Sequence, residues 1–393
     1  MLVLRNTLSR IPFAIISTKL KKRLTWTVVL GILIFFYLIS VNQLIRNTQS
    51  SASPGDPILA TVLSNPMRAV REQELNLPIA YSILVHNNPI RVTRLLKAIY
   101  RPHNQYCIHI DQQSPKAFEE ALEKETFQLG NNIHYIPEHQ RVKVIWGTMN
   151  VLKPEMLCAR LLLAADRKWK YWINLTGDEF PLRTNWELVT ALTALNGSNI
   201  VEAQLPKQQF YRYPPRYYLN FNFTWYKGGV HVALRREFVE YMLTNPKAIQ
   251  LYNALEQYEI RSPFPRFPDE IYFATLNHNP EVFRVPGAFL GRHERDVAIL
   301  MTRAKVWSFD GLPCSTKYWR RQICIFGVND LPFLFNHPHF FANKLLPQVE
   351  PIAYDFLELW HTSKILYEMS FNKLHPSFNL TYYQKHEFSW NHL

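Results

Sequence analysis

Short apolar runs alternate with longer amphipathic segments along much of the chain. Residues 79–85 form a β-branched run, and Asn88-Pro89 then provides an N-cap and a first helical residue for a helix through Tyr100. A long amphipathic helix is predicted over 148–167, and further strands are predicted at 106–110, 133–136 and 171–175. This alternation predicts an α/β domain whose mostly parallel sheet has helices on both faces.

The second half of the chain, from Val201 on, is richer in aromatic residues and prolines. It contains strand-like pieces around 217–225 and a predicted helix over 269–276, and we expect it to complete the same domain. Ligands of such sheets bind outside the carboxyl ends of the strands. His86, Asp111 and the pair Asp178-Glu179 each follow a predicted strand end.

A different pattern occupies the N-terminal region. The run 24–41 is uncharged and about long enough to cross a bilayer, with six Lys/Arg before it and only Arg46 soon after. We therefore predict a cytoplasmic tail at 1–23, a transmembrane signal-anchor at 24–45, a luminal stem at 46–76 and a luminal domain at 77–393. A cleaved signal peptide is the alternative, but the run is long and no small-residue cleavage site follows it.

The net charge of the chain does not alter these predictions. The formal net charge is +13, but seven of the 44 Lys/Arg fall in the first 49 residues, which leaves 37 against 31 acidic residues. No later basic run or nucleic-acid-binding motif is present, so nucleic acid is not an expected partner.

Four cysteines fall in the predicted luminal part, where an even number indicates disulfides more often than catalysis or metal binding. Glycosylation sequons begin at Asn196, Asn222 and Asn379, in keeping with the same compartment. A fourth sequon, at Asn174, continues an apolar run and is predicted to be buried.

The chain lacks the motifs of several nucleotide enzymes. It has no Gly-x-Gly-x-x-Gly or Walker lysine loop. It also has no Asp-x-Asp, the usual holder of the metal that neutralises the diphosphate of a nucleotide-sugar. The nearest substitute, 294–296, is interpreted as a solvated loop. If phosphates are bound, Arg and Lys side chains must bind them.

Glu270 is a candidate base for a hydroxyl group. It follows the proline-rich stretch 262–268 and opens the predicted helix, where the positive helix end keeps a carboxylate ionised. Alternatively, Asp269 caps this helix and Glu270 only complements its dipole. Position alone does not decide between the two.

Several segments, taken in order, resemble the core-2/I-branching β-1,6-N-acetylglucosaminyltransferases, glycosyltransferase family 14, of which the chain is a divergent member. The resemblance runs from about residue 78 to about residue 344. The segments that carry it are 78–86, 94–100, 106–111, 172–182, 268–270, 324–327 and 341–344.

The resemblance implies a GT-A-type, Rossmann-like mixed or parallel sheet and a metal-independent reaction with no cofactor beyond the sugar donor. Glu270 matches the catalytic base of the family. The implied donor-binding residues are Leu84, His86, Asp111, Arg321 and Lys344, the last two as diphosphate-binding cations. The implied disulfides join Cys107 to Cys158 and Cys314 to Cys324.

Acceptor-binding positions match less closely. Arg212 and Trp307 match acceptor contacts of the family, but a family lysine is replaced by Gln209. A family glutamate falls at Val201, with Glu202 one position away. Glu179 also stands where the family usually has Asp.

These residues predict a type II Golgi membrane protein that transfers GlcNAc from UDP-GlcNAc, with inversion, to a C6 hydroxyl of galactose or GalNAc in glycoprotein O-glycans. Two alternatives remain open. In the first, the chain is a related transferase whose donor is UDP-xylose, UDP-glucose or UDP-glucuronic acid. In the second, it is an inactive sugar-binding Golgi protein.

Overall fold

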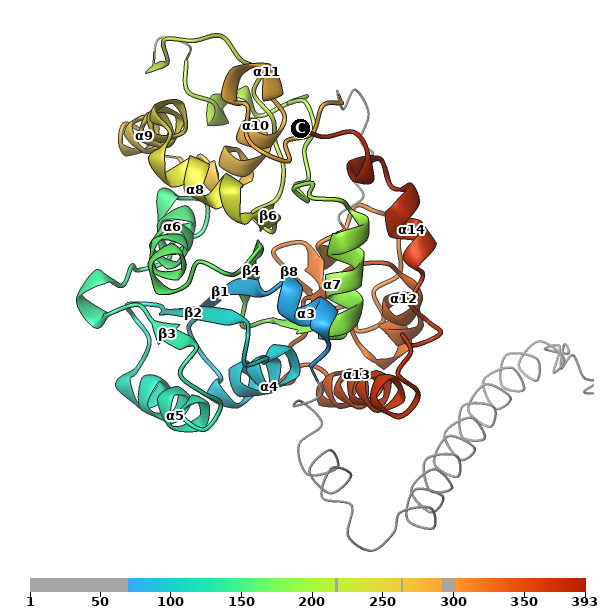
Figure 1. The fold of residues 1–393 in the computed structure, drawn as a ribbon. Helices are drawn as coiled ribbons and strands as arrows, with labels where there is room; N and C mark the ends of the chain where they lie inside the picture. Colours follow the sequence, from blue (N-terminus) through green and yellow to red (C-terminus); the bar gives the residue numbers. More distant parts are fainter. Residues whose placement is uncertain (1–69, 216–217, 263, 292–300) are drawn as a thin grey trace, which may run out of the picture. The chain divides into compact units, whose positions relative to one another are not determined.

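The computed structural model describes residues 70–215, 218–262, 264–291 and 301–393 (Figure 1). The predicted tail and anchor, 1–45, lie outside the described residues, as does the predicted stem up to residue 69. Within the described ranges, no helix combines the length and apolar character that a bilayer crossing requires.

A five-stranded sheet forms the centre of the fold, with the strand order β3-β2-β1-β4-β6. The first four strands are parallel, and β6 pairs antiparallel with β4. The strands are β1 (Ile79–Val85), β2 (Gln105–Ile110), β3 (Ile133–Tyr135), β4 (Tyr171–Thr176) and β6 (Ala233–Arg235). Strands β1, β2 and β4 are almost entirely buried, as expected for parallel strands covered on both faces.

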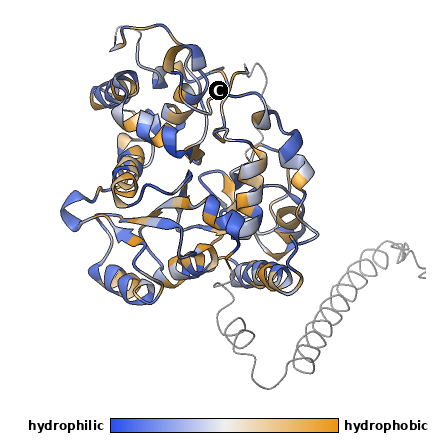
Figure 2. Ribbon diagram, in the orientation of Figure 1, coloured by the Kyte–Doolittle hydropathy of each residue, from blue (hydrophilic) through white to orange (hydrophobic). Residues whose placement is uncertain are grey.

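Helices cover both faces of this sheet. Alternate residues of β1 point in opposite directions, so Ala80 joins the core under α6 (Met149–Ala165), while Tyr81 joins the core under α4 (Pro89–Ile99). Figure 1 shows α6 on one side of the strands and α4 with α5 (Lys116–Thr126) on the other. Figure 2 shows hydrophobic residues along the central strands and mixed hydropathy on the surrounding helices.

A second, smaller sheet has the order β5-β10-β7. Its strands are β5 (Glu179–Pro181), β7 (Arg303–Ala304) and β10 (Phe341–Asn343). A separate apolar core packs this sheet against α12 (Leu331–Asn336) and α13 (Pro351–Phe371). Because only two residues separate β4 from β5, the carboxyl end of β4 in the first sheet lies next to the start of β5 in the second sheet.

The remaining elements lie around these two sheets. The two-stranded hairpin consists of β8 (Trp319–Arg320) and β9 (Ile323–Cys324). The other α-helices are α3 (Glu72–Asn76), α7 (Asn185–Ala194), α8 (Arg236–Thr244), α9 (Pro246–Ile260), α10 (Tyr272–Asn277), α11 (Pro280–Phe283) and α14 (Leu380–Lys385). Short 3₁₀ turns are η2 (Glu138–Gln140), η3 (Phe210–Arg212), η5 (Pro268–Glu270), η6 (Val328–Asp330) and η7 (Glu387–Ser389).

The predicted strands and helices of the first half match the structure within about two residues, and Asn88 caps α4 by accepting a hydrogen bond from the Arg91 amide. The predicted stem, 46–76, extends too far. Residues Glu72–Asn76 form α3, which packs on α7, and the side chain of Glu74 is buried.

Two predictions for the second half are wrong. Residues 218–225 form no strand, although Gln204 pairs with Lys227 in an isolated bridge; Tyr217 lies outside the described residues. The predicted helix 269–276 begins later, at Tyr272, because 268–270 is a 3₁₀ turn. Asp269 is therefore not the helix cap, and its side chain is buried.

Candidate active site

Three predicted donor-binding residues lie at or just after the carboxyl ends of β1 and β2. Leu84 is the second-last residue of β1. His86 directly follows β1, and Asp111 directly follows β2. Asp111 is fixed by the backbone, since its Oδ2 accepts a hydrogen bond from the Val144 amide at 2.8 Å. Burial lowers the pKa of His86, and the charge of Asp178 opposes this shift only in part. The ring is thus neutral near pH 7.

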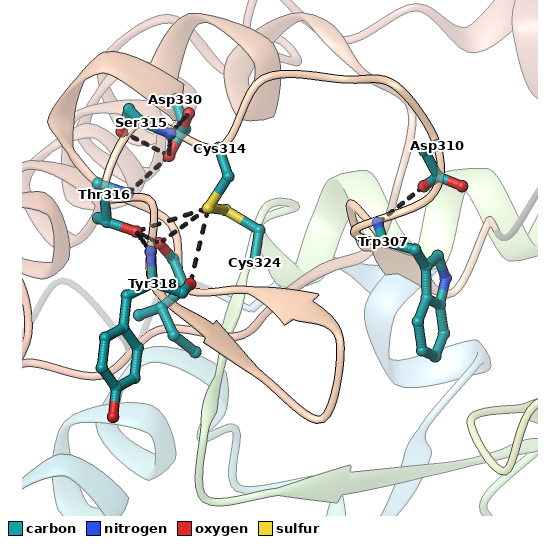
Figure 3. The surroundings of a disulfide bond; sticks show 10 residues. Trp307, Asp310, Cys314, Ser315, Thr316, Tyr318, Cys324 and Asp330 are labelled. Carbon is teal, nitrogen blue, oxygen red and sulfur yellow. Dashed lines mark hydrogen bonds between the residues drawn. A yellow bond between two sulfur atoms is a disulfide. The ribbon is translucent and has the colours of Figure 1, made fainter.

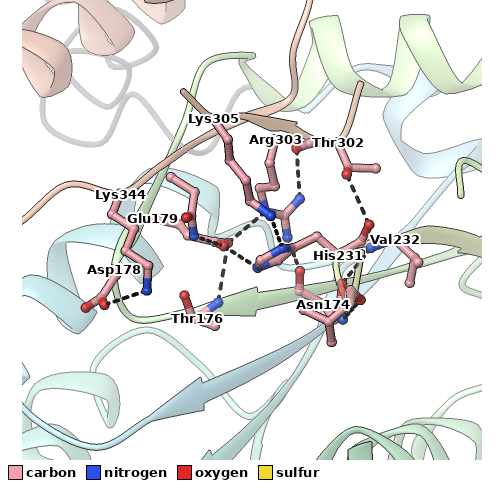
Figure 4. A network of polar contacts seen from close by, with 12 residues as sticks. Asn174, Thr176, Asp178, Glu179, His231, Val232, Thr302, Arg303, Lys305 and Lys344 are labelled. Atoms are coloured by element: carbon pink, nitrogen blue, oxygen red, sulfur yellow. Dashed lines mark hydrogen bonds and ion pairs between the residues drawn. The ribbon is translucent and has the colours of Figure 1, made fainter. Parts of the chain in front are cut away.

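Three cationic side chains surround Asp178, which lies in the connection between β4 and β5. Its carboxylate lies 2.6 Å from Arg91, 3.8 Å from Arg320 and 3.6 Å from Lys344. Figure 4 shows the Lys344 side chain directed at Asp178. Burial lowers the pKa of Lys344, with Asp178 acting in the opposite direction. The predicted phosphate cation Lys344 is thereby held in a mostly buried position beside Asp178.

Arg321 occupies the tip of the β8–β9 hairpin. Arg321 and Gln322 both have positive φ, 52° and 64°, which is the backbone of a type I′ turn. Such turns favour Asn and Gly, and each residue with a Cβ costs about 1–2 kcal/mol in this region. The fold therefore holds Arg321 in an unfavourable backbone conformation that fixes its direction. The adjacent Arg320 is a second cation at this position. The pair Arg320-Arg321 is visible in the sequence, but only Arg321 was predicted as a site residue.

A disulfide bond fixes the base of this hairpin. Cys314 is joined to Cys324 in β9, with the pairing that the resemblance implies (Figure 3). Asp330 accepts hydrogen bonds from the backbone and hydroxyl of Ser315 next to the disulfide. The other predicted disulfide, Cys107 to Cys158, ties β2 to α6 within the core.

Trp307 lies beside the hairpin, where it forms an isolated bridge with Ile323. Its amide donates a hydrogen bond to Asp310 at 2.8 Å (Figure 3), and its ring stacks on Phe309 with 5.6 Å between centroids. The indole is partly accessible, and Phe309 is exposed. The pair thus presents an aromatic surface of the kind that stacks on a sugar ring.

Glu270 ends the 3₁₀ turn before α10 and faces two cations. Its Oε2 lies 2.7 Å from the Arg212 guanidinium and 3.6 Å from the Lys227 ammonium. The Glu270 side chain is 26% exposed, so it combines fixed position with access to a ligand. The Gly228 amide donates to the Glu270 carbonyl at 2.6 Å, which ties the turn to the segment bearing Lys227.

The predicted acceptor residue Glu202 lies in the same region as Glu270. The carbonyl of Glu202 approaches Gly228 so closely that a Cβ there would lie 1.9 Å from it, and its carboxylate approaches Gly229. Burial raises the pKa of Glu202, and the charges of Lys305 and Lys227 oppose this shift. The two glycines therefore permit the close approach of the Glu202 and Lys227 segments.

A buried polar network lies between the residues around Asp178 and the residues around Glu202 (Figure 4). Glu179 and Arg303 have side chains with no exposed surface and lie 3.0 Å apart. Nε2 of His231 is 2.9 Å from Glu179, and Nδ1 accepts a hydrogen bond from Lys305 at 2.9 Å. Burial raises the pKa of Glu179, but the charge of Arg303, together with the hydrogen bonds that His231 and Arg303 donate, outweighs burial and leaves the pKa well below its usual value. Burial lowers the pKa of His231 to about 3, so its ring is neutral.

The sequons differ in accessibility. Asn196, Asn222 and Asn379 are exposed. Asn174 is buried in β4, where its side chain donates to the Val230 carbonyl at 2.7 Å. The prediction that Asn174 is buried is therefore confirmed.

Among the described residues, no three His, Cys, Asp or Glu side chains are grouped to hold a metal ion. Residues 294–296, interpreted as a solvated loop, lie outside the described ranges. Metal independence thus stays a prediction.

The predicted site residues fall into two neighbouring sets. Asp178 and the charges around it link the donor set His86, Asp111, Arg321 and Lys344. Glu270 links the acceptor set Glu202 and Arg212. Residues that the sequence interpretation missed are Asp178 as a cation anchor, Lys227, Lys305 and Trp146, whose indole packs on Arg321. Asp178 follows a predicted strand end and Lys227 precedes two glycines, so both carry a sequence signal, whereas the contacts of Lys305 and Trp146 depend on tertiary packing.

Comparison with known proteins identifies the family. A sequence model described as "Branch: Core-2/I-Branching enzyme" matches residues 79–334. The Danio rerio protein named beta-1,3-galactosyl-O-glycosyl-glycoprotein beta-1,6-N-acetylglucosaminyltransferase 4 is 35% identical over 320 residues, covering 74% of this chain and 71% of that protein. The Homo sapiens protein of the same name, numbered 3, is 29% identical over 327 residues, covering 75% of this chain and 70% of that protein.

Similarity to solved structures is distant. The galactosyltransferase LgtC, in complex with donor and acceptor sugar analogues, matches with a TM-score of 0.30 and 13% identity, covering 49% of this chain and 68% of that one. The family model and the sequence relatives establish that the chain belongs to the Core-2/I-Branching enzyme family of glycosyltransferases.

Proposed function

We propose that this glycosyltransferase transfers GlcNAc from UDP-GlcNAc to the C6 hydroxyl of galactose or GalNAc in an O-glycan, forming a β-1,6 branch. The names of the Danio rerio and Homo sapiens relatives support this transferred sugar and linkage. The observation that carries the proposal is the Glu270 carboxylate, which is partly exposed and held by Arg212 and Lys227.

In this mechanism Glu270 is the general base. The acceptor hydroxyl gives its proton to the carboxylate while its oxygen attacks the anomeric carbon of the donor sugar. The bond from that carbon to the phosphate oxygen breaks, UDP leaves, and the configuration at the anomeric carbon is inverted. A positioned base of this kind contributes about 10²- to 10⁴-fold to the rate.

The leaving diphosphate gains negative charge as the bond breaks. Arg321 and Lys344 bind it and stabilise this charge, while His86, Asp111 and Leu84 line the uridine and ribose pocket. Because Lys344 is mostly buried beside Asp178 and Arg321 is fixed on the hairpin, both cations are positioned before the donor arrives. We propose that these cations perform the role that a divalent metal has in other glycosyltransferases.

On the acceptor side, Arg212, Glu202 and the aromatic surface of Trp307 bind the glycan. The protein acts as a type II membrane protein of the Golgi, anchored by 24–45 with its catalytic domain in the lumen. The hydropathy and charge pattern of the N-terminal region supports this topology.

The proposal is tested with the full-length protein solubilised in detergent. UDP-GlcNAc, UDP-xylose, UDP-glucose and UDP-glucuronic acid are each offered with a galactose–GalNAc mucin-type acceptor, and products are analysed by NMR for linkage and anomeric configuration. We expect a β-1,6-linked GlcNAc product, and a loss of about 10²- to 10⁴-fold in kcat for Glu270→Gln.

Other results distinguish the alternatives. A product formed only from another UDP-sugar identifies that donor and overturns the GlcNAc assignment. UDP binding without transfer or hydrolysis of any donor identifies an inactive binding protein. Unchanged turnover in Glu270→Gln removes Glu270 from the role of base.

A further inference from the structure

Arg321 has an unusual environment for a cation at the tip of a hairpin. Among the described residues, none of its contacts is an ion pair with a carboxylate, and its guanidinium carbon lies 5.0 Å from the centre of the Trp146 ring. Burial lowers the pKa of Arg321, and the charge of Arg320 lowers it further. The guanidinium is therefore held by an aromatic face and has its charge available for an anion.

Trp146 itself is fixed to the loop that precedes Glu270. Its ring meets Phe267 edge to face, with 4.7 Å between centroids and 79° between planes. The carbonyl of Gly147 accepts hydrogen bonds from the amides of Arg266 at 3.0 Å and Phe267 at 2.9 Å. A side chain at Gly147, where φ is +80°, would lie 2.7 Å from Pro265, so only glycine permits this close approach.

Phe267 continues the connection to the base. The guanidinium carbon of Arg212 lies 4.0 Å from the centre of the Phe267 ring, and the same guanidinium contacts Glu270 at 2.7 Å. Phe267 has a φ of 55°, an unfavourable value for a residue with a large side chain. Local strain is thus retained where the ring separates Arg212 from Trp146.

We propose that Trp146 is a positioning residue for the diphosphate cation Arg321 and aligns that cation with the base Glu270 through Phe267. This inference rests on the proposed function and deepens it. The indole is 50% exposed, so it is not retained merely to fill the core. Its ring face orders the guanidinium by a cation–π contact, and its contact with Phe267 fixes the distance between the donor and acceptor sets.

The effect follows from the strength of a cation–π contact. A cation–π contact stabilises less at an exposed site than where water is excluded. Over that range, loss of the contact changes an equilibrium constant by about 2- to 30-fold. Trp146→Ala should raise the Kd for UDP and lower kcat, each within that range. Trp146→Phe, which keeps a ring, should retain most of both, and Trp146→Leu, which keeps bulk without a ring, should resemble Trp146→Ala.

A double-mutant cycle separates positioning from a general structural role. Full-length protein carrying Trp146→Ala, Arg321→Ala or both is titrated with UDP by calorimetry and assayed with the donor that the wild type uses. If Trp146 acts through Arg321, then Trp146→Ala changes the Kd by less than about 2-fold once Arg321 is absent. Trp390→Ala, at another exposed tryptophan, is the control and should leave both parameters unchanged.

Two outcomes overturn the inference. One is a Trp146→Ala enzyme with wild-type Kd and kcat. The other is an equal loss in the presence and absence of Arg321, which would mean that the indole contacts the substrate itself. Failure of the proposed function is distinct from both, because the wild-type protein would then transfer a sugar other than GlcNAc or no sugar at all.

Discussion

The buried ion pair between Glu179 and Arg303 gives a quantitative prediction for stability. Both side chains have no exposed surface, and Glu179 is the carboxylate that compensates Arg303 at 3.0 Å. Glu179→Gln keeps the shape of the side chain but removes its charge, which leaves the Arg303 guanidinium buried without a counter-charge. Breaking one partner of such a pair costs about 3–5 kcal/mol.

This cost converts to a change in melting temperature. The folded unit Pro66–Leu393 has about 330 residues, and unfolding entropy of about 2.1 cal/mol/K per residue gives about 0.7 kcal/mol per degree. Glu179→Gln should therefore lower the Tm by about 4–7 °C. The measurement is thermal unfolding of the full-length protein in detergent at pH 7, followed by intrinsic tryptophan fluorescence.

A surface ion pair provides the matched control. Arg236 and Glu240 lie 2.9 Å apart, but the Glu240 side chain is 49% exposed. Exposed pairs contribute at most about 1 kcal/mol, so Glu240→Gln should shift the Tm by about 1.5 °C or less. Equal shifts in Glu179→Gln and Glu240→Gln would refute the argument from burial, as would a Glu179→Gln protein with wild-type Tm.

Three further predictions concern the loop, the base region and the sequons. Replacing both Cys314 and Cys324 by Ser should weaken UDP binding in calorimetry, because the disulfide fixes the hairpin that carries Arg321; unchanged affinity would show that the hairpin holds its shape alone. Burial, and then the charge of Glu270, raise the pKa of Asp269 to about 7. Its buried carboxyl is fully protonated below the unfolded-state pKa, and stability falls as pH rises from about 4 to about 7. Asp269→Asn should therefore raise the Tm at pH 8 and leave it unchanged at pH 3.5, and an equal effect at both pH values would contradict this origin. Peptide mapping after glycan release should find modification at exposed Asn379 but not at buried Asn174, and a glycan at Asn174 would contradict the structure.

The sequence predicted the first half of the fold well because its elements depend on local patterns. The β-branched run of β1 and the Asn88-Pro89 start of α4 contain their own signals. The segment before Glu270 does not. Phe267 adopts positive φ and Pro268 opens a 3₁₀ turn, so the helix begins at Tyr272 against its local propensity. Packing of Phe267 against Gly147 imposes this start, and no local pattern predicts it.

The candidate site was predicted in part, for a similar reason. Resemblance to a family supplied Glu270, Arg321 and Lys344 as chemical groups. It did not supply their surroundings, because Arg212 reaches Glu270 across 58 positions and Trp146 reaches Arg321 across a much longer stretch. Contacts of this range arise from the tertiary fold, and no periodicity or spacing in the sequence encodes them.

We propose that Arg321 and Lys344 replace a divalent metal at the diphosphate. The most direct measurement is the rate of sugar transfer by the full-length protein in excess EDTA, compared with the rate in Mn²⁺, together with the Kd for UDP of Arg321→Ala and Lys344→Ala. We expect full activity in EDTA, no stimulation by Mn²⁺ and weaker UDP binding in both variants. Activity that disappears on chelation and returns with Mn²⁺ would contradict it.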